Sequence, residues 1–424
     1  MAVLARLENR GERAYLVGGC LRDLLRGRVP HDWDVATSAP PERVGALFPR
    51  TLPTGLEYGT VSVWTGLRWV QVTTFRSEGA YGDRRHPSEV RWLDRVEGDL
   101  ARRDYTVNAM ALGLDGRLID PWGGLEDLRA GRVRAVGDPL ERFREDPLRV
   151  VRGARLCAET GWSMEEATAQ AALRGAADLA GVSRERLFAE MQRLLMGDRA
   201  AQGVALLWRT GAVWAVVGGA AGELGEEEVG HLGEAVERAP REEASRWTAF
   251  LHLFSRAEEV AAQRILVGRL RRRVEELLRV LRRLSGVAAR EGGGGATANG
   301  QPIPSLGVEA REWASRLAPE EARLLAGWLA AHPWESCPRA VLSPAAGRAW
   351  SRALREVVER GDPCRVGQLA VRGDQVARWL GQGGAAIGRE LERLAAWVRE
   401  DPARNRPERL RRHLLERRSE EGRA

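Results

Sequence analysis

Residues 18–37, GGCLRDLLRGRVPHDWDVAT, form the most informative segment of this sequence. Its two glycines, of which Gly19 is the second, separate a strand-like run from a helical one. Backbone N–H groups at such a turn can face an anion, and glycine lets a phosphate approach closely. Arg22 follows one helical turn later, and Asp32 and Asp34 open the next strand-like run. The segment therefore predicts a phosphate-binding turn with a pair of carboxylates beside it.

The carboxylate pair predicts a metal site. Side chains two residues apart on a strand point to the same face, so Asp32 and Asp34 can act together. Carboxylate oxygens are hard ligands of the kind that Mg²⁺ prefers, and metal ions held here would bridge a bound triphosphate. An Asp-x-Asp pair on its own is also typical of a surface turn. The glycine turn and Arg22 at a fixed distance ahead of the pair favour the metal site.

The flanking segments place this motif in a small α/β domain. We expect strands at residues 14–19, 34–37, 59–64 and 68–75, a hairpin turn at Thr65 and Gly66, and helices at 21–27 and 40–48. After Asp138, apolar residues recur at three- and four-residue spacing, which is typical of helices. We also expect a basic helix at 269–284 and a linker at the four glycines 292–295.

The composition indicates a soluble, basic protein with a polyanionic partner. The 424 residues carry a net charge of +7, and all 66 basic residues are arginine. A GC-rich genome explains arginine in place of lysine, but the net positive charge favours a nucleic acid as the partner. Without a long apolar run or an apolar leader, we expect neither a membrane-spanning helix nor a secretory signal. The four cysteines lie far apart and form no Cys-x-x-Cys pair, which predicts a cytoplasmic protein without a zinc site or disulfide framework.

A second charged segment, ARRDYTVNAMA, covers residues 101–111. Arg102 and Arg103 are always charged and can donate in pairs to phosphate oxygens. Asp104 and Asn108 are four residues apart, so at helical spacing they share a face. A carboxylate and an amide there could bind ribose hydroxyls, although a helix cap is the alternative for Asp104.

A third segment, EDPLR at residues 145–149, predicts either a helix cap or a base-reading pair. Pro147 suits the first position of a helix, which would make Asp146 its N-cap. Alternatively, Asp146 accepts from an exocyclic amino group while Arg149 donates to the adjacent ring nitrogen. Cytosine and adenine both offer this pair of groups, whereas uracil and guanine offer the reverse polarity. The second interpretation predicts selection of CTP and ATP over UTP and GTP.

Arg152 and Arg155 continue the three-residue spacing of this segment. At about 100° per residue, Arg155 lies roughly opposite Asp146 on a helix. We therefore expect Arg155 to contact the triphosphate and not the same base.

These motifs together resemble the signature of the polymerase-β-type nucleotidyltransferases, in the class II tRNA nucleotidyltransferase branch, which holds CCA-adding enzymes and bacterial poly(A) polymerases. The matching segments are residues 18–37, 54–63, 72–90, 101–111, 145–156 and 182–191 (VSRERLFAEM). The resemblance is dense over residues 12–195 and returns weakly at 371–405. It implies a polymerase-β-type α/β head followed by an all-α neck, body and tail, which we divide into residues 1–138, 139–200, 201–300 and 301–424.

The resemblance also implies an activity and a set of site residues. The activity is template-independent addition of CMP, CMP and AMP from CTP and ATP to the 3′ end of tRNA, with release of pyrophosphate. Asp32 and Asp34 are the implied catalytic residues and hold two Mg²⁺. The implied nucleotide-binding residues are Gly19, Arg22, Arg103, Asp104, Asn108, Glu145, Asp146, Arg149, Arg152 and Arg155. Three alternatives stay open: an A-adding enzyme, a poly(A) polymerase and a catalytically silent RNA-binding protein. The oligomeric state also stays open, and a homodimer is one option.

The sequence departs from the family pattern at two places. Gln71 stands where many relatives of the wider superfamily carry a third carboxylate, although two aspartates are usual in the class II branch. The tail reads GQGG at residues 381–384, without the basic residue that normally precedes the glycine pair. The loop at 78–90 has its full length, whereas family members restricted to C addition tend to have it shortened. An enzyme that adds only C is therefore a less favoured alternative.

Overall fold

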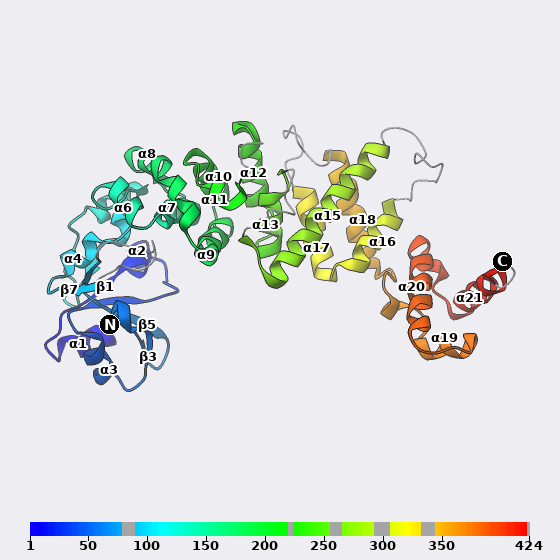
Figure 1. Cartoon of the computed structure of the whole chain (residues 1–424), viewed down its shortest axis with the longest axis horizontal. Helices are drawn as coiled ribbons and strands as arrows, with labels where there is room; N and C mark the ends of the chain where they lie inside the picture. The colour runs from blue at the N-terminus through cyan, green and yellow to red at the C-terminus, as the bar shows by residue number, and fades with distance from the viewer. Residues whose placement is uncertain (79–89, 219–223, 255–264, 292–305, 332–343, 422–424) are drawn as a thin grey trace. The chain divides into compact units, whose positions relative to one another are not determined.

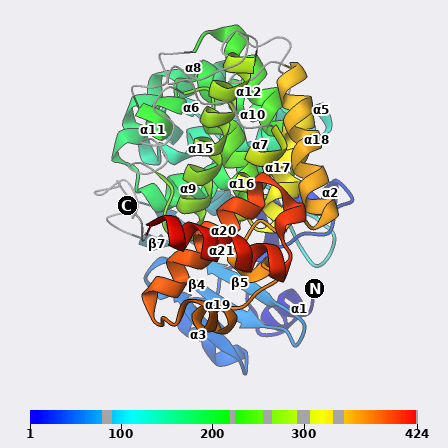
Figure 2. The same cartoon turned by 90° about the vertical axis from the view of Figure 1, so that its right-hand side faces the viewer.

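The computed structural model divides into two compact units. The structure describes every residue except 79–89, 219–223, 255–264, 292–305, 332–343 and 422–424. The N-terminal unit comprises residues 1–233 and 262–266, and the C-terminal unit comprises residues 234–261 and 267–424 (Figure 1, Figure 2). The expected linker at 292–295 and most of the loop at 78–90 lie outside the described residues. Within the described part of the chain, no helix is long and apolar enough to cross a membrane.

A mixed sheet of seven strands organises the start of the N-terminal unit, in the blue and cyan part of Figure 1. Its strand order is β3-β4-β5-β2-β1-β8-β9, and β2 and β5 are its parallel pair. Its strands are β1 (Ala14–Val17), β2 (Asp34–Thr37), β3 (Thr51–Gly55), β4 (Thr60–Trp64), β5 (Trp69–Thr74), β8 (Ala111–Leu112) and β9 (Leu118–Ile119). Two further ladders pair β6 (Arg76–Glu78) with β7 (Val90–Trp92) and β10 (Arg132–Val133) with β11 (Ser163–Met164).

Helices make up most of the remaining described chain. The N-terminal unit contains α1 (Ala2–Glu8), α2 (Gly18–Leu25), α3 (Pro41–Leu47), α4 (Val96–Ala101), α5 (Gly124–Ala130), α6 (Pro139–Glu145), α7 (Leu148–Thr160), α8 (Glu166–Gly175), α9 (Arg184–Leu195), α10 (Ala200–Arg209) and α11 (Val213–Val217). α12 (Glu226–Arg238) spans the boundary between the units. The C-terminal unit contains α13 (Glu243–Leu251), α15 (Gly268–Glu291), α16 (Leu306–Arg316), α17 (Pro319–Ala331), α18 (Pro344–Arg360), α19 (Gly373–Leu380), α20 (Ala385–Glu400) and α21 (Pro407–Glu421).

Successive residues of the central strands β1 and β2 are buried on opposite sides of the sheet, since side chains alternate along a strand. Leu16 of β1 and Val35 of β2 belong to a core cluster that includes residues of α1 and α3. The next residues, Val17 and Ala36, belong to a second cluster that includes residues of α4. β1 runs antiparallel to β2 with Leu16 opposite Val35, so the end of β1 lies beside the beginning of β2. This register brings the glycine turn next to Asp34.

The predicted α/β head followed by a helical chain is confirmed, with local differences. β1 ends at Val17 and the two glycines already belong to α2, whereas the sequence predicted a strand up to residue 19. The hairpin between β4 and β5 is present, and Thr65 donates to the carbonyl of Arg68 at 3.0 Å. The expectation of helix after Asp138 is wrong at Ser163–Met164, because these residues form a parallel ladder with a strand about thirty residues earlier. Such non-local pairing leaves no periodic signal in the sequence.

Candidate active site

The turn after β1 lies against a carboxylate and an arginine. Gly18 has a φ of +73°, in the left-handed region that favours glycine. A Cβ atom at this position would lie 3.0 Å from Nη1 of Arg103 and 3.3 Å from Oδ2 of Asp34. The missing side chain therefore leaves room for both charged groups beside the first turn of α2.

Arg22, one turn further along α2, contacts the site through Asn108. Its Nη1 donates to Oδ1 of Asn108 at 2.9 Å, while Nε and Nη2 donate to Oδ1 of Asp23 at 2.9 Å. The guanidinium is buried. Arg22 thus fixes an amide of the predicted ribose-binding segment.

The two predicted metal ligands have different surroundings. Asp34 is the half-buried first residue of β2, whose bounds match the strand predicted at 34–37, whereas Asp32 is exposed in the bend before the strand. Burial raises the pKa of Asp34, Arg103 lowers it and the carboxylate of Asp32 raises it, with a net upward shift. Burial and repulsion from Asp32 both disfavour the ionised form of Asp34, and a divalent cation would offset both effects. The donor set therefore fits a metal ion with oxygen ligands.

A third carboxylate does not join this pair. In the described residues, no group of three or more His, Cys, Asp or Glu side chains is arranged to hold a metal ion. Gln71 of β5 pairs in register with Asp34 of β2. The position at which the sequence resemblance implies a third carboxylate thus lies directly across from Asp34 and carries an amide.

Asp104 and Asn108 meet through a short 3-10 helix, η2 (Thr106–Asn108), and not along an α-helix as the spacing suggested. Oδ1 of Asp104 accepts from Nδ2 of Asn108 at 3.1 Å and from the backbone N–H of Tyr105 at 2.8 Å. Burial acts to raise the pKa of Asp104, but Arg152 and the hydrogen bond from Asn108 outweigh it and hold the pKa below its usual range. The carboxylate is therefore an ionised acceptor.

Asp146 makes both a cap-like and a long-range contact. α6 ends at Glu145 and α7 begins at Leu148, so Pro147 and not Asp146 is the N-cap residue. Oδ1 of Asp146 still accepts from the backbone N–H of Leu148 at 3.2 Å, and Oδ2 accepts from Nη2 of Arg186 at 2.7 Å. The contact with Arg186, forty residues away on α9, has no counterpart in a simple helix cap.

Arg149 is buried and held by contacts from three directions. Its Nη1 donates to Oε2 of Glu145 at 2.7 Å and to the carbonyl of Arg142 at 3.1 Å, and its Nη2 donates to the carbonyl of Arg102 at 2.9 Å. A guanidinium has five N–H groups, of which these contacts use three. Glu145 lies at the end of α6 and pairs with both Arg142 and Arg149, without lining the pocket.

Arg152 and Arg155 are joined by a single carboxylate. Nε of Arg152 lies 2.9 Å from Oε1 of Glu190, and Nε of Arg155 lies 2.6 Å from Oε2 of the same residue. Burial acts to lower the pKa of Arg152, but Glu190 and Asp104 outweigh it and raise the pKa. Arg155 also pairs with Glu159 at 3.1 Å and does not line the pocket.

One pocket of about 340 Å³ unites the motifs. Eight of the predicted residues line it, and Asp32, Arg22, Glu145 and Arg155 do not. The lining residues are Gly18, Gly19, Asp34, Arg76, Arg102, Arg103, Asp104, Asn108, Asp146, Arg149 and Arg152. The glycine turn, the arginine pair and the base-reading candidates therefore face one common space, although they lie as far apart in the sequence as Gly18 and Arg149.

Several residues of this region were not singled out by sequence reasoning. Arg76 lines the pocket and donates to the carbonyl of Tyr58. Asp99 holds Arg102 and Arg103, and Arg186 and Glu190 hold Asp146 and the arginines of α7. Arg76, Arg186 and Glu190 lie within segments that match the family pattern, which is a signal that could have found them. Asp99 had no such signal.

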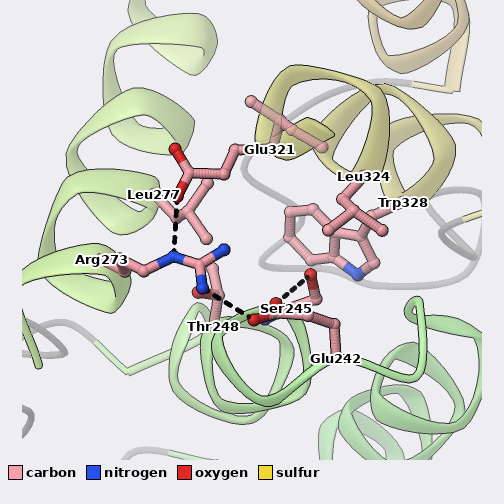
Figure 3. Close-up of a pocket in the computed structure, with 9 residues that line it drawn as sticks. Glu242, Ser245, Thr248, Arg273, Leu277, Glu321, Leu324 and Trp328 are labelled. Atoms are coloured by element: carbon pink, nitrogen blue, oxygen red, sulfur yellow. Dashed lines mark hydrogen bonds and ion pairs between the residues drawn. The ribbon is translucent and has the colours of Figure 1, made fainter. Parts of the chain in front are cut away.

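A second small cavity lies in the C-terminal unit, between α13, α15 and α17 (Figure 3). Arg273 lies between two carboxylates there, 2.8 Å from Oε1 of Glu321 and 3.1 Å from Oε1 of Glu242. Leu324 and Trp328 close the apolar side. The cavity has a volume of about 10 Å³, room for about one water molecule, so it is too small for a nucleotide.

Two family models match the N-terminal unit. Residues 14–134 match the poly A polymerase head domain, and residues 161–216 match the probable RNA and SrmB-binding site of polymerase A. The first range contains the sheet, and the second contains α8, α9 and α10.

Known proteins similar to this chain include CCA-adding enzymes. The chain is 43% identical over 207 residues to the CCA-adding enzyme of Leuconostoc mesenteroides, covering 49% of this chain and 52% of that protein. It is 44% identical over 211 residues to the CCA-adding enzyme of Geobacillus stearothermophilus, covering 50% and 52%. The chain therefore spans about half the length of the curated relatives it matches.

Solved structures match over almost the whole chain. The Bacillus stearothermophilus CCA-adding enzyme in complex with CTP is 30% identical with a TM-score of 0.74, covering 100% of this chain and 98% of that one. The Thermotoga maritima CCA-adding enzyme complexed with tRNA is 18% identical with a TM-score of 0.68, covering 98% and 93%. The second similarity concerns the fold alone.

Proposed function

This chain belongs to the class II tRNA nucleotidyltransferase family of CCA-adding enzymes and poly(A) polymerases, and we propose that it adds CMP, CMP and AMP, without a nucleic-acid template, to the 3′ end of tRNA. CTP and ATP are the donors and pyrophosphate is released. The observation that carries the proposal is the single pocket in which the glycine turn, Asp34 and Arg103 face Asp146 and Arg149. One space can thereby receive a triphosphate and its base.

The triphosphate is held at the glycine end of this pocket. Gly19 supplies a backbone N–H at the first turn of α2, and Arg103 and Arg152 supply permanent positive charge. The carboxylate of Asp104 accepts hydrogen bonds from the ribose hydroxyls, and the amide of Asn108 donates to them. Arg22 orients Asn108 for this contact through the 2.9 Å hydrogen bond to its side-chain oxygen.

Asp32 and Asp34 would hold divalent metal ions, which we propose to be Mg²⁺. Such ions, when bound, lower the pKa of the tRNA 3′-hydroxyl and offset the charge of the departing pyrophosphate. The burial of Asp34 and its proximity to Asp32 support this assignment, because both make an uncompensated carboxylate costly. Gly18 keeps the adjacent backbone close to the same carboxylate.

Asp146 and Arg149 select the base. The carboxylate accepts from the amino group of cytosine or adenine, and the guanidinium donates to the ring nitrogen beside it. A carboxylate has about four lone-pair sites, so the contacts of Asp146 with Leu148 and Arg186 leave capacity for a base. UTP and GTP present the reverse polarity and would make neither of these base contacts, which disfavours them by orders of magnitude in a site of this type.

We further propose that the protein acts in the cytoplasm on tRNA. The thiols of Cys20, Cys157 and Cys364 are free and buried, which suits a reducing compartment. The net charge of +7 suits a partner with a phosphate backbone.

The test offers the purified full chain three tRNAs that end at the discriminator base, at the first C and at the second C, with each nucleotide in turn. The proposal expects C, C and A, in that order. Addition of A alone, only to the CC end, would identify an A-adding enzyme. Long A tails on any RNA would identify a poly(A) polymerase, and binding without incorporation would identify a silent RNA-binding protein.

A further inference from the structure

Asp99 is a fully buried carboxylate at the base of the pocket's arginine pair. It lies on α4, two residues before the helix ends. Its Oδ1 accepts from Nε and Nη2 of Arg102 at 3.0 and 2.8 Å, and its Oδ2 accepts from Nη2 of Arg103 at 3.1 Å. The backbone N–H of Arg76 lies 3.4 Å from Oδ1. One side chain therefore contacts three pocket-lining residues while not lining the pocket itself.

The geometry of Arg103 depends on this contact. The guanidinium uses Nη2 for Asp99, while its Nη1 lies 3.5 Å from the carbonyl of Asn108 and close to the turn at Gly18. The side chain thus extends between a buried carboxylate and the glycine turn. Its position over the turn is the position that a phosphate-binding cation requires.

Electrostatics explains why a carboxylate is needed at this point. Arg102 and Arg103 are adjacent in sequence and share one small space, so their positive charges repel each other. Burial acts to raise the pKa of Asp99, but the two guanidiniums outweigh burial and hold the pKa below its usual range. The ionised carboxylate offsets the repulsion and directs both guanidiniums, whose planar donors match its two oxygens.

We propose that Asp99 is a positioning residue, which orients Arg102 and Arg103 to bind the phosphate groups of the nucleoside triphosphate. This inference rests on the proposed function, since it assumes that the pocket receives a triphosphate. Asp99 touches neither the substrate nor the reacting atoms; it acts through the two arginines.

Asp127 provides a matched control within the same unit. It is also fully buried, and it pairs with Arg134 at 2.8 Å and with Arg132 at 3.5 Å. It also accepts from the hydroxyl of Thr106 at 2.6 Å. Neither of its arginine partners lines the pocket. Loss of its charge removes a buried ionic contact of the same kind, without altering the arginines beside the glycine turn.

The experiment compares the full-length wild type with Asp99→Asn, Asp99→Glu and Asp127→Asn. Calorimetry measures the Kd for inorganic tripolyphosphate, steady-state assays measure KM and kcat for CTP, and thermal melts measure stability. Asp99→Asn should weaken tripolyphosphate binding and raise KM by about tenfold or more, because the charge that directs the two guanidiniums is lost. Asp99→Glu should recover part of the affinity, since it restores the charge. Asp127→Asn should lower the melting temperature and leave Kd and KM within about twofold.

The outcomes separate this inference from the proposed function. In one outcome, the wild type binds tripolyphosphate and Asp99→Asn loses that binding, while neither adds nucleotides to tRNA. This result would support the inference and overturn the function. Normal addition of nucleotides by the wild type, with an unchanged Kd in a folded Asp99→Asn, would overturn the inference alone. Equal losses of affinity in Asp99→Asn and Asp127→Asn would also overturn it, because a general structural role would then suffice. A wild type that binds no tripolyphosphate would contradict both.

Discussion

Two Glu–Arg pairs with the same four-residue spacing occupy very different environments. Glu145 and Arg149 in the N-terminal unit lie 2.7 Å apart, and Glu356 and Arg360 in the C-terminal unit lie 2.9 Å apart. The side chain of Arg149 is 7% exposed, whereas that of Arg360 is 66% exposed. Arg149 also donates to the carbonyl of Arg102, forty-seven residues away. Identical local spacing therefore yields a fixed pocket residue in one case and a solvated surface pair in the other.

Burial and long-range contacts decide what a charge can do. A solvated pair gains little, because water screens it and both side chains stay mobile. A buried charge is costly unless it is paired, so its partners determine its position. The pocket arginines consequently have defined geometry, and substitutions among their partners should have the larger effects.

The largest effect is expected at the proposed metal ligands. Asp34→Ala or Asp32→Ala should lower kcat for nucleotide addition by at least about 100-fold, because the metal ions serve the chemical step. Affinity for tRNA should change little, since it arises from many phosphate contacts. Single-turnover assays at saturating Mg²⁺ and filter binding measure the two quantities, with exposed Asp115→Ala as the control. Retention of more than about a tenth of the wild-type rate would contradict the two-metal assignment.

The next effect concerns base selection. Asp146→Ala should make UTP competitive with CTP, because the acceptor that requires an amino group is gone. Arg149→Ala should slow CTP and ATP addition alike. We would measure kcat/KM for the four nucleotides with Asp146→Ala and Asp146→Asn, together with thermal melts. If Asp146 only caps α7, its loss would cost about 0.5–2 kcal/mol of stability and leave the CTP:UTP preference unchanged.

Alanine substitutions at Gly18 and Gly45 test whether the close approach of Arg103 to the turn requires glycine. Gly18→Ala should destabilise the protein by about 1–2 kcal/mol and raise KM for CTP, because a methyl group at positive φ would press on Arg103. Gly45 of α3 has ordinary helical backbone and nothing within 4 Å of its Cβ position. Gly45→Ala should therefore stabilise by about 0.5–1 kcal/mol and leave KM unchanged. Urea unfolding and nucleotide kinetics measure both, and equal KM values for the two variants would refute the steric argument.

A buried histidine supplies a pH test for the C-terminal unit. Burial lowers the pKa of His252 from 6.5 to about 4. Between these values the unfolded chain binds a proton that the folded chain does not, so stability falls as the pH drops through this window. We expect His252 to account for about 2 kcal/mol of the loss between pH 7 and pH 5. Urea melts of His252→Phe should lack this part of the loss, while exposed His31→Gln should retain it.

The smallest effect is expected at the exposed pair. Arg360→Ala should change the free energy of unfolding by less than about 0.5 kcal/mol. Arg149→Ala should cost several times more, because it removes a buried guanidinium that donates to Glu145 and to the carbonyls of Arg142 and Arg102. Parallel urea melts of the two variants measure this difference. Similar losses for both would mean that burial does not separate the two pairs.

Much of the head and of the candidate site was predictable because its signals are local. The glycine turn, the alternation in β4 and β5 and the helical spacing after Asp138 each follow from a few neighbouring residues. The ladder at Ser163–Met164 was not predictable, since its partner strand lies about thirty residues earlier. Asp99 was missed for a similar reason: nothing in its immediate neighbours distinguishes it from a surface aspartate in a short helix.

Backbone preferences and hydrophobic periodicity act over a few residues, so the α/β head, the helical remainder and most of the residue types at the site follow from the sequence. Which charges share a space follows instead from long-range contacts in the folded chain. Folding joined Asp146 to Arg186, placed Glu190 between Arg152 and Arg155, and turned Arg22 toward Asn108. These contacts link segments 35 to 86 residues apart, and each exists because a charge taken out of water must find a partner wherever the folded chain offers one.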